Sequence, residues 1–185
     1  MRFFVFFSLF LSLFACAKKD TCLNPAVKQN QSGFTLATSI TYSMPGGWLK
    51  ALDKGQMSFE ERIIDPISQA RIKVFYFEGM RDMVSENIQR WKKQFQSDSM
   101  NILSEKLIEK NGLQINELII SGTFIDKLEP MNPNSDAILR PNHMLRAYIV
   151  ETQTGTWFFK ALASENVMQL QENNFKNFVN GLKAN

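Results

Sequence analysis

The alternation of hydrophobic and polar positions predicts strands in the first half of the folded region. Residues 34–42 alternate between large side chains and smaller or polar ones, which predicts a strand with one buried face. Pro45, Gly46 and Gly47 then predict a turn, since Pro cannot donate to a β-ladder and Gly accepts positive φ. Residues 57–64 predict a weaker strand and residues 71–77 a clear one.

A helix is predicted after these strands. Val84, Ile88, Trp91 and Phe95 recur at steps of four, three and four residues, the spacing of one helix face. A cluster of Ser and Asp follows Phe95 and predicts the end of the helix there.

The second half of the chain is predicted to be mostly sheet. Residues 102–109 and 113–125 flank Asn111-Gly112, a strong signal for a hairpin. The apolar run at 118–120 favours a central strand covered on both faces. Residues 144–151 and 156–163 predict a second hairpin around residues 153–155.

Two other segments complete the folded region. The Pro- and Asn-rich residues 127–142 predict a loop long enough to be functional or mobile. Residues 164–182 predict a closing helix whose apolar stripe holds Met168, Phe175, Phe178, Val179 and Leu182. The order of elements predicts an α+β domain over residues 34–185, an antiparallel β-sheet flanked by helices.

The first 15 residues have a different pattern. Arg2 precedes an apolar stretch from Phe3 to Ala15, and the charged residues Lys18, Lys19 and Asp20 follow. A basic start, a short apolar core and small residues at its end are typical of a secretory signal, and the stretch is too short to span a bilayer comfortably. We interpret residues 1–15 as a signal peptide.

The cleavage site leaves two alternatives. Leu13-Phe14-Ala15-Cys16 resembles the lipobox of bacterial lipoproteins, in which the Cys is acylated and becomes the new N-terminus, although Phe14 is bulkier than usual. The rival is ordinary cleavage after Ala17, because Ala15-Cys16-Ala17 also fits A-x-A. We favour acylation of Cys16, because the polar residues 17–33 suit a flexible tether of about 20–25 Å.

Lipidation implies an address in the bacterial cell envelope. By resemblance to lipoprotein sorting signals, Ala17 after the Cys favours the outer membrane, with the protein facing the periplasm. Cys22 would then be either an inert thiol in the tether or a disulfide partner for another chain.

Composition adds exclusions rather than a partner. The chain has 185 residues, 44% hydrophobic, and 16 Phe, of which six fall within the first 14 positions and belong to the signal. Twenty-one Lys and Arg against 18 Asp and Glu give a net charge of +3. This surplus is too small to indicate binding of nucleic acid.

Catalytic and metal-binding motifs are missing from the sequence. With His143 as its one histidine, the chain can hold neither H-E-x-x-H nor a site with several histidines. G-x-S-x-G, S-x-x-K and a phosphate loop are absent too, although a scattered triad that uses His143 stays open. We therefore expect no enzyme, no catalytic residue, no metal and no cofactor.

Two basic sets remain as candidate interaction surfaces. Arg90, Lys92 and Lys93 lie beside Trp91 on the predicted helix and could meet acidic headgroups or an acidic partner, or could form an ordinary solvated face. The second set is at the exit of the 127–142 loop and could collect an anionic ligand, unless the loop is simply mobile. It consists of Arg140, His143 and Arg146.

The order of several motifs resembles the PsbP-like family over most of residues 34–183. The motifs are Pro45-Gly46-Gly47-Trp48, the helix segment 87–95, Ser121-Gly122-Thr123-Phe124, Trp157-Phe158-Phe159-Lys160 and the terminal amphipathic helix. That family includes the extrinsic photosystem II protein, a Ran-binding nuclear import factor and many bacterial lipoproteins. The resemblance implies an antiparallel sheet between helical layers, an α/β/α sandwich, and an accessory or binding role.

The sequence thus predicts a lipoprotein tethered through Cys16 whose domain is an accessory or protein-interaction module of the envelope. The alternative is a carrier with a small-ligand pocket between sheet and helices. An interface predicts an exposed apolar patch of several hundred Å², whereas a carrier predicts an enclosed apolar pocket of roughly 300 Å³ or more.

Overall fold

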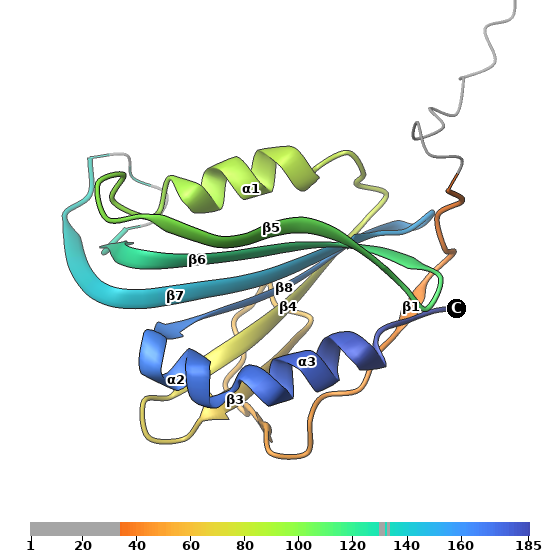
Figure 1. Ribbon diagram of the computed structural model, residues 1–185, viewed down its shortest axis with the longest axis horizontal. Helices are drawn as coiled ribbons and strands as arrows, with labels where there is room; N and C mark the ends of the chain where they lie inside the picture. The colour runs from red at the N-terminus through yellow and green to blue at the C-terminus, as the bar shows by residue number, and fades with distance from the viewer. Residues whose placement is uncertain (1–33, 130–131, 133) are drawn as a thin grey trace, which may run out of the picture. The chain divides into compact units, whose positions relative to one another are not determined.

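A seven-stranded antiparallel sheet forms the centre of the computed structural model, which describes residues 34–129, 132 and 134–185 (Figure 1). The predicted signal peptide, Cys16, Cys22 and the linker lie outside the described residues. The sheet order is β2 (Leu49–Lys50), β3 (Glu60–Asp65), β4 (Ala70–Glu78), β8 (Gly155–Ser164), β7 (Ala137–Glu151), β6 (Leu113–Lys127) and β5 (Asn101–Lys110). A separate pair joins β1 (Ile40–Thr41) to β9 (Lys183–Ala184).

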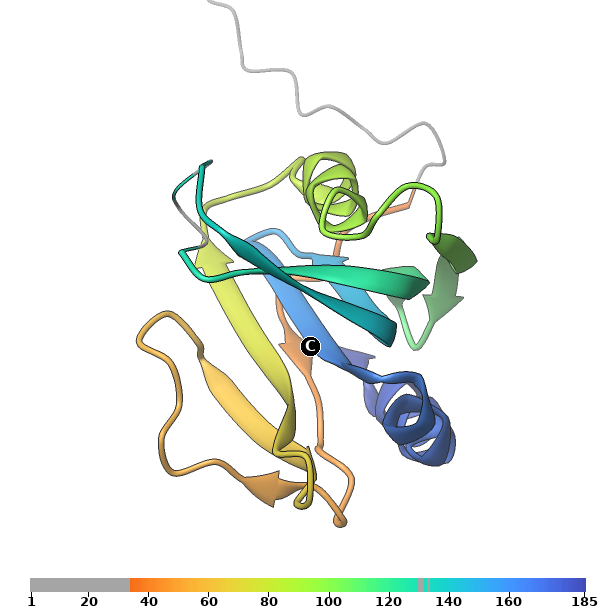
Figure 2. The same cartoon turned by 90° about the vertical axis from the view of Figure 1, so that its left-hand side faces the viewer.

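Helices pack on both faces of this sheet (Figures 1 and 2). On one face, Ile88 and Trp91 of α1 (Val84–Lys92) join a buried cluster with Leu118 and Phe158. The other face is covered by α2 (Glu165–Leu170) and α3 (Glu172–Gly181), whose buried residues belong to a second cluster. The predicted α+β class with an antiparallel sheet is confirmed. No helix in the described part of the chain is long and apolar enough to cross a membrane.

Both predicted hairpins are present. The β5–β6 turn places Asn111 at φ 49° and Gly112 at φ 75°, as a tight turn with two left-handed residues requires. The run 118–120 is buried, with Leu118 and Ile120 in the α1-side cluster and Ile119 in the α3-side cluster. A strand covered on both faces is therefore confirmed at this position.

Three predicted boundaries were wrong. The strand over 34–42 is reduced to Ile40–Thr41, because the carbonyl oxygens of residues 36–38 accept hydrogen bonds from the β7–β8 turn, such as the 2.9 Å bond from the Gln153 N–H to Ala37. The helix ends at Lys92, and Phe95 instead forms an isolated bridge with Phe124. The closing helix is two helices separated at Gln171, although its predicted stripe is buried.

The predicted loop at 127–142 was too long, because β6 continues to Lys127 and β7 already begins at Ala137. Pro141 and Asn142 lie inside β7 at a bulge, where Gly122 pairs with His143 but Phe124 pairs with Arg140. Asn142 has a φ of 53°, which fits the extra residue. Pro141 is tolerated there because β8 ends at the His143–Ser164 pair, so this part of β7 has β6 alone as a neighbour.

Candidate functional site

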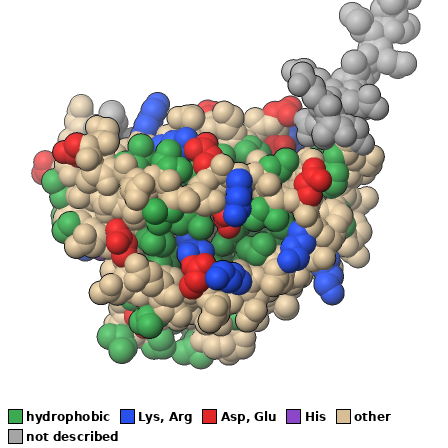
Figure 3. All heavy atoms as spheres, viewed as in Figure 1, with side chains coloured by type: hydrophobic (Ala, Val, Ile, Leu, Met, Phe, Trp, Pro, Cys, Tyr) green, Lys and Arg blue, Asp and Glu red, His purple; other side chains and the backbone are tan. Residues whose placement is uncertain are grey.

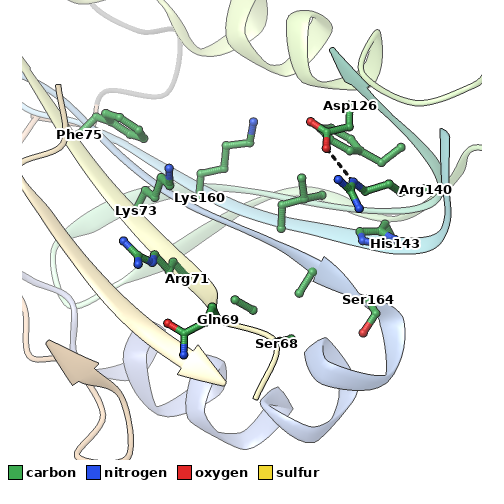
Figure 4. A pocket seen from close by; sticks show the side chains of 14 residues that line it. Ser68, Gln69, Arg71, Lys73, Phe75, Asp126, Arg140, His143, Lys160 and Ser164 are labelled. Atoms are coloured by element: carbon green, nitrogen blue, oxygen red, sulfur yellow. Dashed lines mark hydrogen bonds and ion pairs between the residues drawn. The ribbon is translucent and has the colours of Figure 1, made fainter. Parts of the chain in front are cut away.

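A pocket of about 690 Å³ opens on the α1 side of the sheet, over strands β4, β8 and β7 (Figure 4). Its basic side chains are Arg71, Lys73, Arg140, His143 and Lys160, and Asp126 is the acidic residue among its lining residues. We call it the basic pocket. Phe75, Phe124 and Leu162 supply its apolar walls.

Lys73 and Lys160 form a pair across two strands of this pocket. They are direct cross-strand partners on β4 and β8, so their side chains rise from the same face of the sheet (Figure 4). Lys160 Nζ donates to Gln94 Oε1 at 2.9 Å and lies 5.5 Å from the centroid of the Trp91 ring. Burial, together with the positive charges of Arg90 and Lys73, lowers the pKa of Lys160 to about 8.

A buried carboxylate supports the β4 wall. Glu61 accepts hydrogen bonds from the Ser58 hydroxyl at 2.7 Å and the Gly55 N–H at 2.9 Å. It lies 3.3 Å from Arg71 and 3.9 Å from Lys73. Burial raises the pKa of Glu61, but these hydrogen bonds and cations outweigh burial and hold that pKa below its usual value. Glu61 therefore stays ionised and positions both cations at the wall.

At the end of the pocket near Arg140 and His143, the positive charge of Arg140 is balanced by Asp126. Arg140 Nε lies 2.7 Å from Asp126 Oδ2, and His143 Nδ1 lies 2.9 Å from the Pro141 carbonyl oxygen. The bulge at Asn142 changes the alternation of β7, so that Arg140 and His143 face the same pocket although they are three residues apart. The structure brings these two predicted residues together.

Arg146, the third member of that predicted set, does not join them. It lies on the opposite face of β7, where its guanidinium pairs with Glu172 of α3 and lies 5.3 Å from the centroid of the Phe175 ring. Its exposed fraction is 8%, so it is part of the packing between sheet and helix.

The predicted set on α1 is also divided. Lys92 Nζ pairs with Glu105 on β5 at 2.7 Å, whereas Arg90 donates to Asn87 Oδ1 at 2.6 Å and acts electrostatically on Lys160. Lys93 is exposed, and Trp91 is buried in the α1-side core. Arg90 thus contributes to the positive field of the basic pocket, while Lys92 is neutralised on another side of the helix.

Sequence reasoning missed Arg71, Lys73 and Lys160. A usable signal existed for Lys160, since it interrupts the apolar run Trp157–Ala163 in a strand with hydrophobic neighbours on both sides. A charged residue at such a position is seldom placed there for packing. The pairing with Lys73 required the register of β4 on β8, which the local pattern does not encode.

A second surface feature is apolar. The edge strand β5 exposes Ile102, Leu103 and Leu107 by 41–51% of their surface. Figure 3 shows hydrophobic side chains between charged ones across the middle of the face that includes β5. These residues are scattered among Lys and Glu on the same strand, which is ordinary for an exposed edge.

Comparisons with known proteins identify the fold. No family model matches the sequence, and no curated protein matches it. Among solved structures, the chain is similar to the PsbP protein of Synechocystis sp. PCC 6803 (CyanoP), with a TM-score of 0.50 and 11% identity, over 88% of this chain and 100% of that one.

Two other solved structures have lower TM-scores. LpqN, described as involved in cell envelope biogenesis of Mycobacterium tuberculosis, has a TM-score of 0.46 and 9% identity over 78% of this chain and 82% of that one. PA94 of Pseudomonas aeruginosa, described as a protein of unknown function, has a TM-score of 0.43 and 13% identity over 85% of each chain. The match to CyanoP extends over that entire protein, and this chain therefore has the PsbP-like fold that its sequence motifs predicted.

Proposed function

We propose that this chain is a bacterial envelope lipoprotein, anchored through acylated Cys16, whose domain is a non-catalytic accessory module that binds an anionic group in the basic pocket. The observation that carries the proposal is the pair Lys73 and Lys160, two cations directly opposite each other inside a pocket of about 690 Å³. Like charges in this arrangement destabilise a sheet, so a bound anion would offset a cost that the fold otherwise bears.

The pocket geometry favours binding over chemistry. His143 faces Ser164 across the β7–β8 ladder, and its Nδ1 contacts the Pro141 carbonyl oxygen at 2.9 Å rather than the Ser164 hydroxyl. A serine nucleophile requires a base within hydrogen-bond reach of its hydroxyl. The cations and apolar walls of the pocket instead support the holding of an anionic ligand.

The pocket also suits the binding of an anion better than the binding of an apolar cargo molecule. A carrier for an apolar molecule needs an enclosed apolar cavity. The basic pocket is instead open at Lys73 and Arg140, whose side chains are 50% and 45% exposed. An anion that enters from solvent, either free or displayed on a partner, suits this geometry better than an apolar cargo.

The anchor and the binding site are tested separately. In the native host, Cys16→Ser is expected to move the protein out of the membrane fraction, and Cys22→Ser serves as the matched control that stays in it. An unchanged distribution of Cys16→Ser would contradict the anchor.

For the pocket, isothermal titration of the full chain with a panel of small anions should show binding that weakens in Lys160→Met. If no anion in the panel binds, the recognition role of the pocket is wrong.

A further inference from the structure

The positive charge of the basic pocket is unevenly neutralised. Arg140 is paired with Asp126, and Arg71 is shared between Asp53 and Glu61 at 3.0 and 3.3 Å. Lys160, in contrast, contacts two uncharged groups, the Gln94 amide and the Trp91 ring. The unbalanced charge is therefore concentrated at one end, around Lys160.

Two further cations strengthen this end. Lys73 reaches its nearest carboxylate, Glu61, only at 3.9 Å, and that carboxylate is already shared with Arg71. Arg90 lies near enough to Lys160 to affect its titration, and its hydrogen-bond partner Asn87 is neutral. Two ammonium groups and a guanidinium thus act on the same end of the pocket.

The charge of this cluster matches a phosphate monoester better than a carboxylate. A phosphate monoester carries about −1.5 to −2 at pH 7 and offers three strong acceptor oxygens. A carboxylate carries a single negative charge and two oxygens. A group with about two charges and three acceptors can contact Lys73 and Lys160 together, which neutralises the repulsion between the two lysines.

The rest of the pocket has room for more than the phosphate. Its volume of about 690 Å³ lies in the ordinary range for sites that hold small organic molecules. From Lys160 to Ser164 the β8 strand advances about 13 Å, at about 3.3 Å per residue. Leu162 lies midway along this length, and Phe124 lines the same pocket, so the pocket offers apolar contact beyond Lys160.

We propose that the basic pocket binds an organic phosphate monoester, with the phosphate between Lys73 and Lys160 and an apolar body along β8 toward His143. This inference rests on the proposed anion-binding function and names its ligand class. The same chemistry occurs in a free aryl or alkyl phosphate and in the monoester headgroup of a phosphatidic acid lipid.

The test uses the full lipidated chain in phosphatidylcholine vesicles and isothermal titration with phenyl phosphate. There are three comparison ligands. Inorganic phosphate lacks the apolar body, phenol lacks the negative charge, and benzoate carries a carboxylate in place of the phosphate. Phenyl phosphate is expected to bind at least tenfold more tightly than any of the three. Lys160→Met is expected to weaken it at least tenfold, and Lys183→Met, an exposed lysine of β9 outside the pocket, to leave it unchanged.

The outcomes separate this inference from the proposed function. Phenyl phosphate binding that Lys160→Met leaves unchanged, or that is no tighter than benzoate or inorganic phosphate binding, overturns the ligand class. If benzoate binds in a Lys160-dependent manner and phenyl phosphate does not, the anion-binding function holds and the class is wrong. If no anion binds, the proposed anion-binding function and the proposed ligand class are both wrong. A melting curve of Lys160→Met confirms that the variant is folded in each case.

A second arm identifies the source of the phosphate. The titration is repeated in vesicles that also contain phosphatidic acid. A tenfold loss of phenyl phosphate affinity there would show that the lipid headgroup occupies the pocket, whereas unchanged affinity would indicate a free ligand.

Discussion

Lys73 and Lys160 face each other across adjacent strands β4 and β8, on the part of the sheet face that forms the basic pocket. Direct cross-strand neighbours have Cβ atoms about 4.5–5.5 Å apart, so two ammonium groups here repel each other. Lys160 is also partly withdrawn from water, which adds a desolvation cost to its charged form. The pair is therefore a site at which stability and ligand binding are opposed.

The first prediction is that Lys160→Met stabilises the protein at pH 7 while it weakens anion binding. Methionine keeps much of the side-chain length and removes the buried charge, so the repulsion with Lys73 disappears. We expect the melting temperature to rise by about 2–4 °C, the shift that about 1 kcal/mol produces in a domain of this size. Circular dichroism melting measures it, with Lys183→Met as the exposed control.

A lower melting temperature for Lys160→Met would contradict the first prediction. It would mean that the contacts of Lys160 with Gln94 and Trp91 outweigh the burial of its charge. Lys160 would then be a structural residue rather than one retained for binding.

The second prediction concerns pH. The pKa of Lys160 is about 8 in the folded protein and about 10.4 in an unfolded chain. Between these values the unfolded state holds more protons, so the stability of the wild type rises with pH across this window. The difference in melting temperature between Lys160→Met and wild type should therefore narrow from pH 8 to pH 10.

The comparison with the variant isolates Lys160 from other groups. Burial, with smaller effects of neighbouring charges, raises the pKa of Tyr148 to about 12, and burial and Glu60 raise that of Tyr42 as well. These tyrosines favour the folded state less as the pH rises above 10, but they do so equally in both proteins. A difference in melting temperature that stays constant from pH 7 to pH 10 would refute the assigned pKa.

The third prediction tests the separation of Arg146 from the pocket. Glu172→Gln removes the carboxylate partner of Arg146, which is 8% exposed. Arg146 lies on the face of the sheet that α3 covers, opposite the pocket. Because Glu172 itself is 38% exposed, we expect a loss of about 1–3 kcal/mol in the free energy of unfolding rather than the full cost of a broken buried pair. Anion affinity should not change.

Urea denaturation measures the stability loss in Glu172→Gln. Lys176→Met is the matched control, because Lys176 forms the exposed i,i+4 pair with the same carboxylate and should change stability by less than about 0.5 kcal/mol. A change in anion affinity in Glu172→Gln alone would mean that Arg146 does act on the pocket.

The fourth prediction concerns the β7 bulge. Asn142 has a φ of 53°, a conformation that glycine accepts and β-branched residues resist. Asn142→Val should lower the free energy of unfolding by about 1–2 kcal/mol, and Asn142→Gly should stay near the wild type. Urea denaturation compares the two variants. Equal stability of Val and Gly here would show that the bulge is not maintained by this residue.

Several features of the fold followed from local sequence. Asn111-Gly112 predicted its hairpin because two consecutive left-handed residues are nearly specific to that turn. The stripe of Met168, Phe175 and Phe178 predicted a buried helix face, since apolar side chains at that spacing must be covered. The break at Gln171 did not follow, because it coincides with a bond from Trp48 Nε1 to Gln171 Oε1 across 123 residues of sequence.

The candidate site was predicted only in part. The sequence predicts Arg140 and His143 as basic residues near a Pro- and Asn-rich segment, but it predicts that segment as a loop. Proline and asparagine favour turns locally, and a bulge at an unpaired part of a strand accommodates the same two residues. Arg146 was grouped with them by proximity in sequence, although alternation along β7 sends it to the opposite face.

The sequence by itself determined the hairpins, the buried helix faces and the α+β class, because these depend on periodicity and on residues with restricted backbone conformations. It also supplied the predictions of a signal peptide and of an acylated Cys16. Only the tertiary structure decided which cations share a surface. Lys73 and Lys160 are 87 positions apart in the chain and meet because β4 pairs with β8 in one register, and register is set by the packing of the whole sheet.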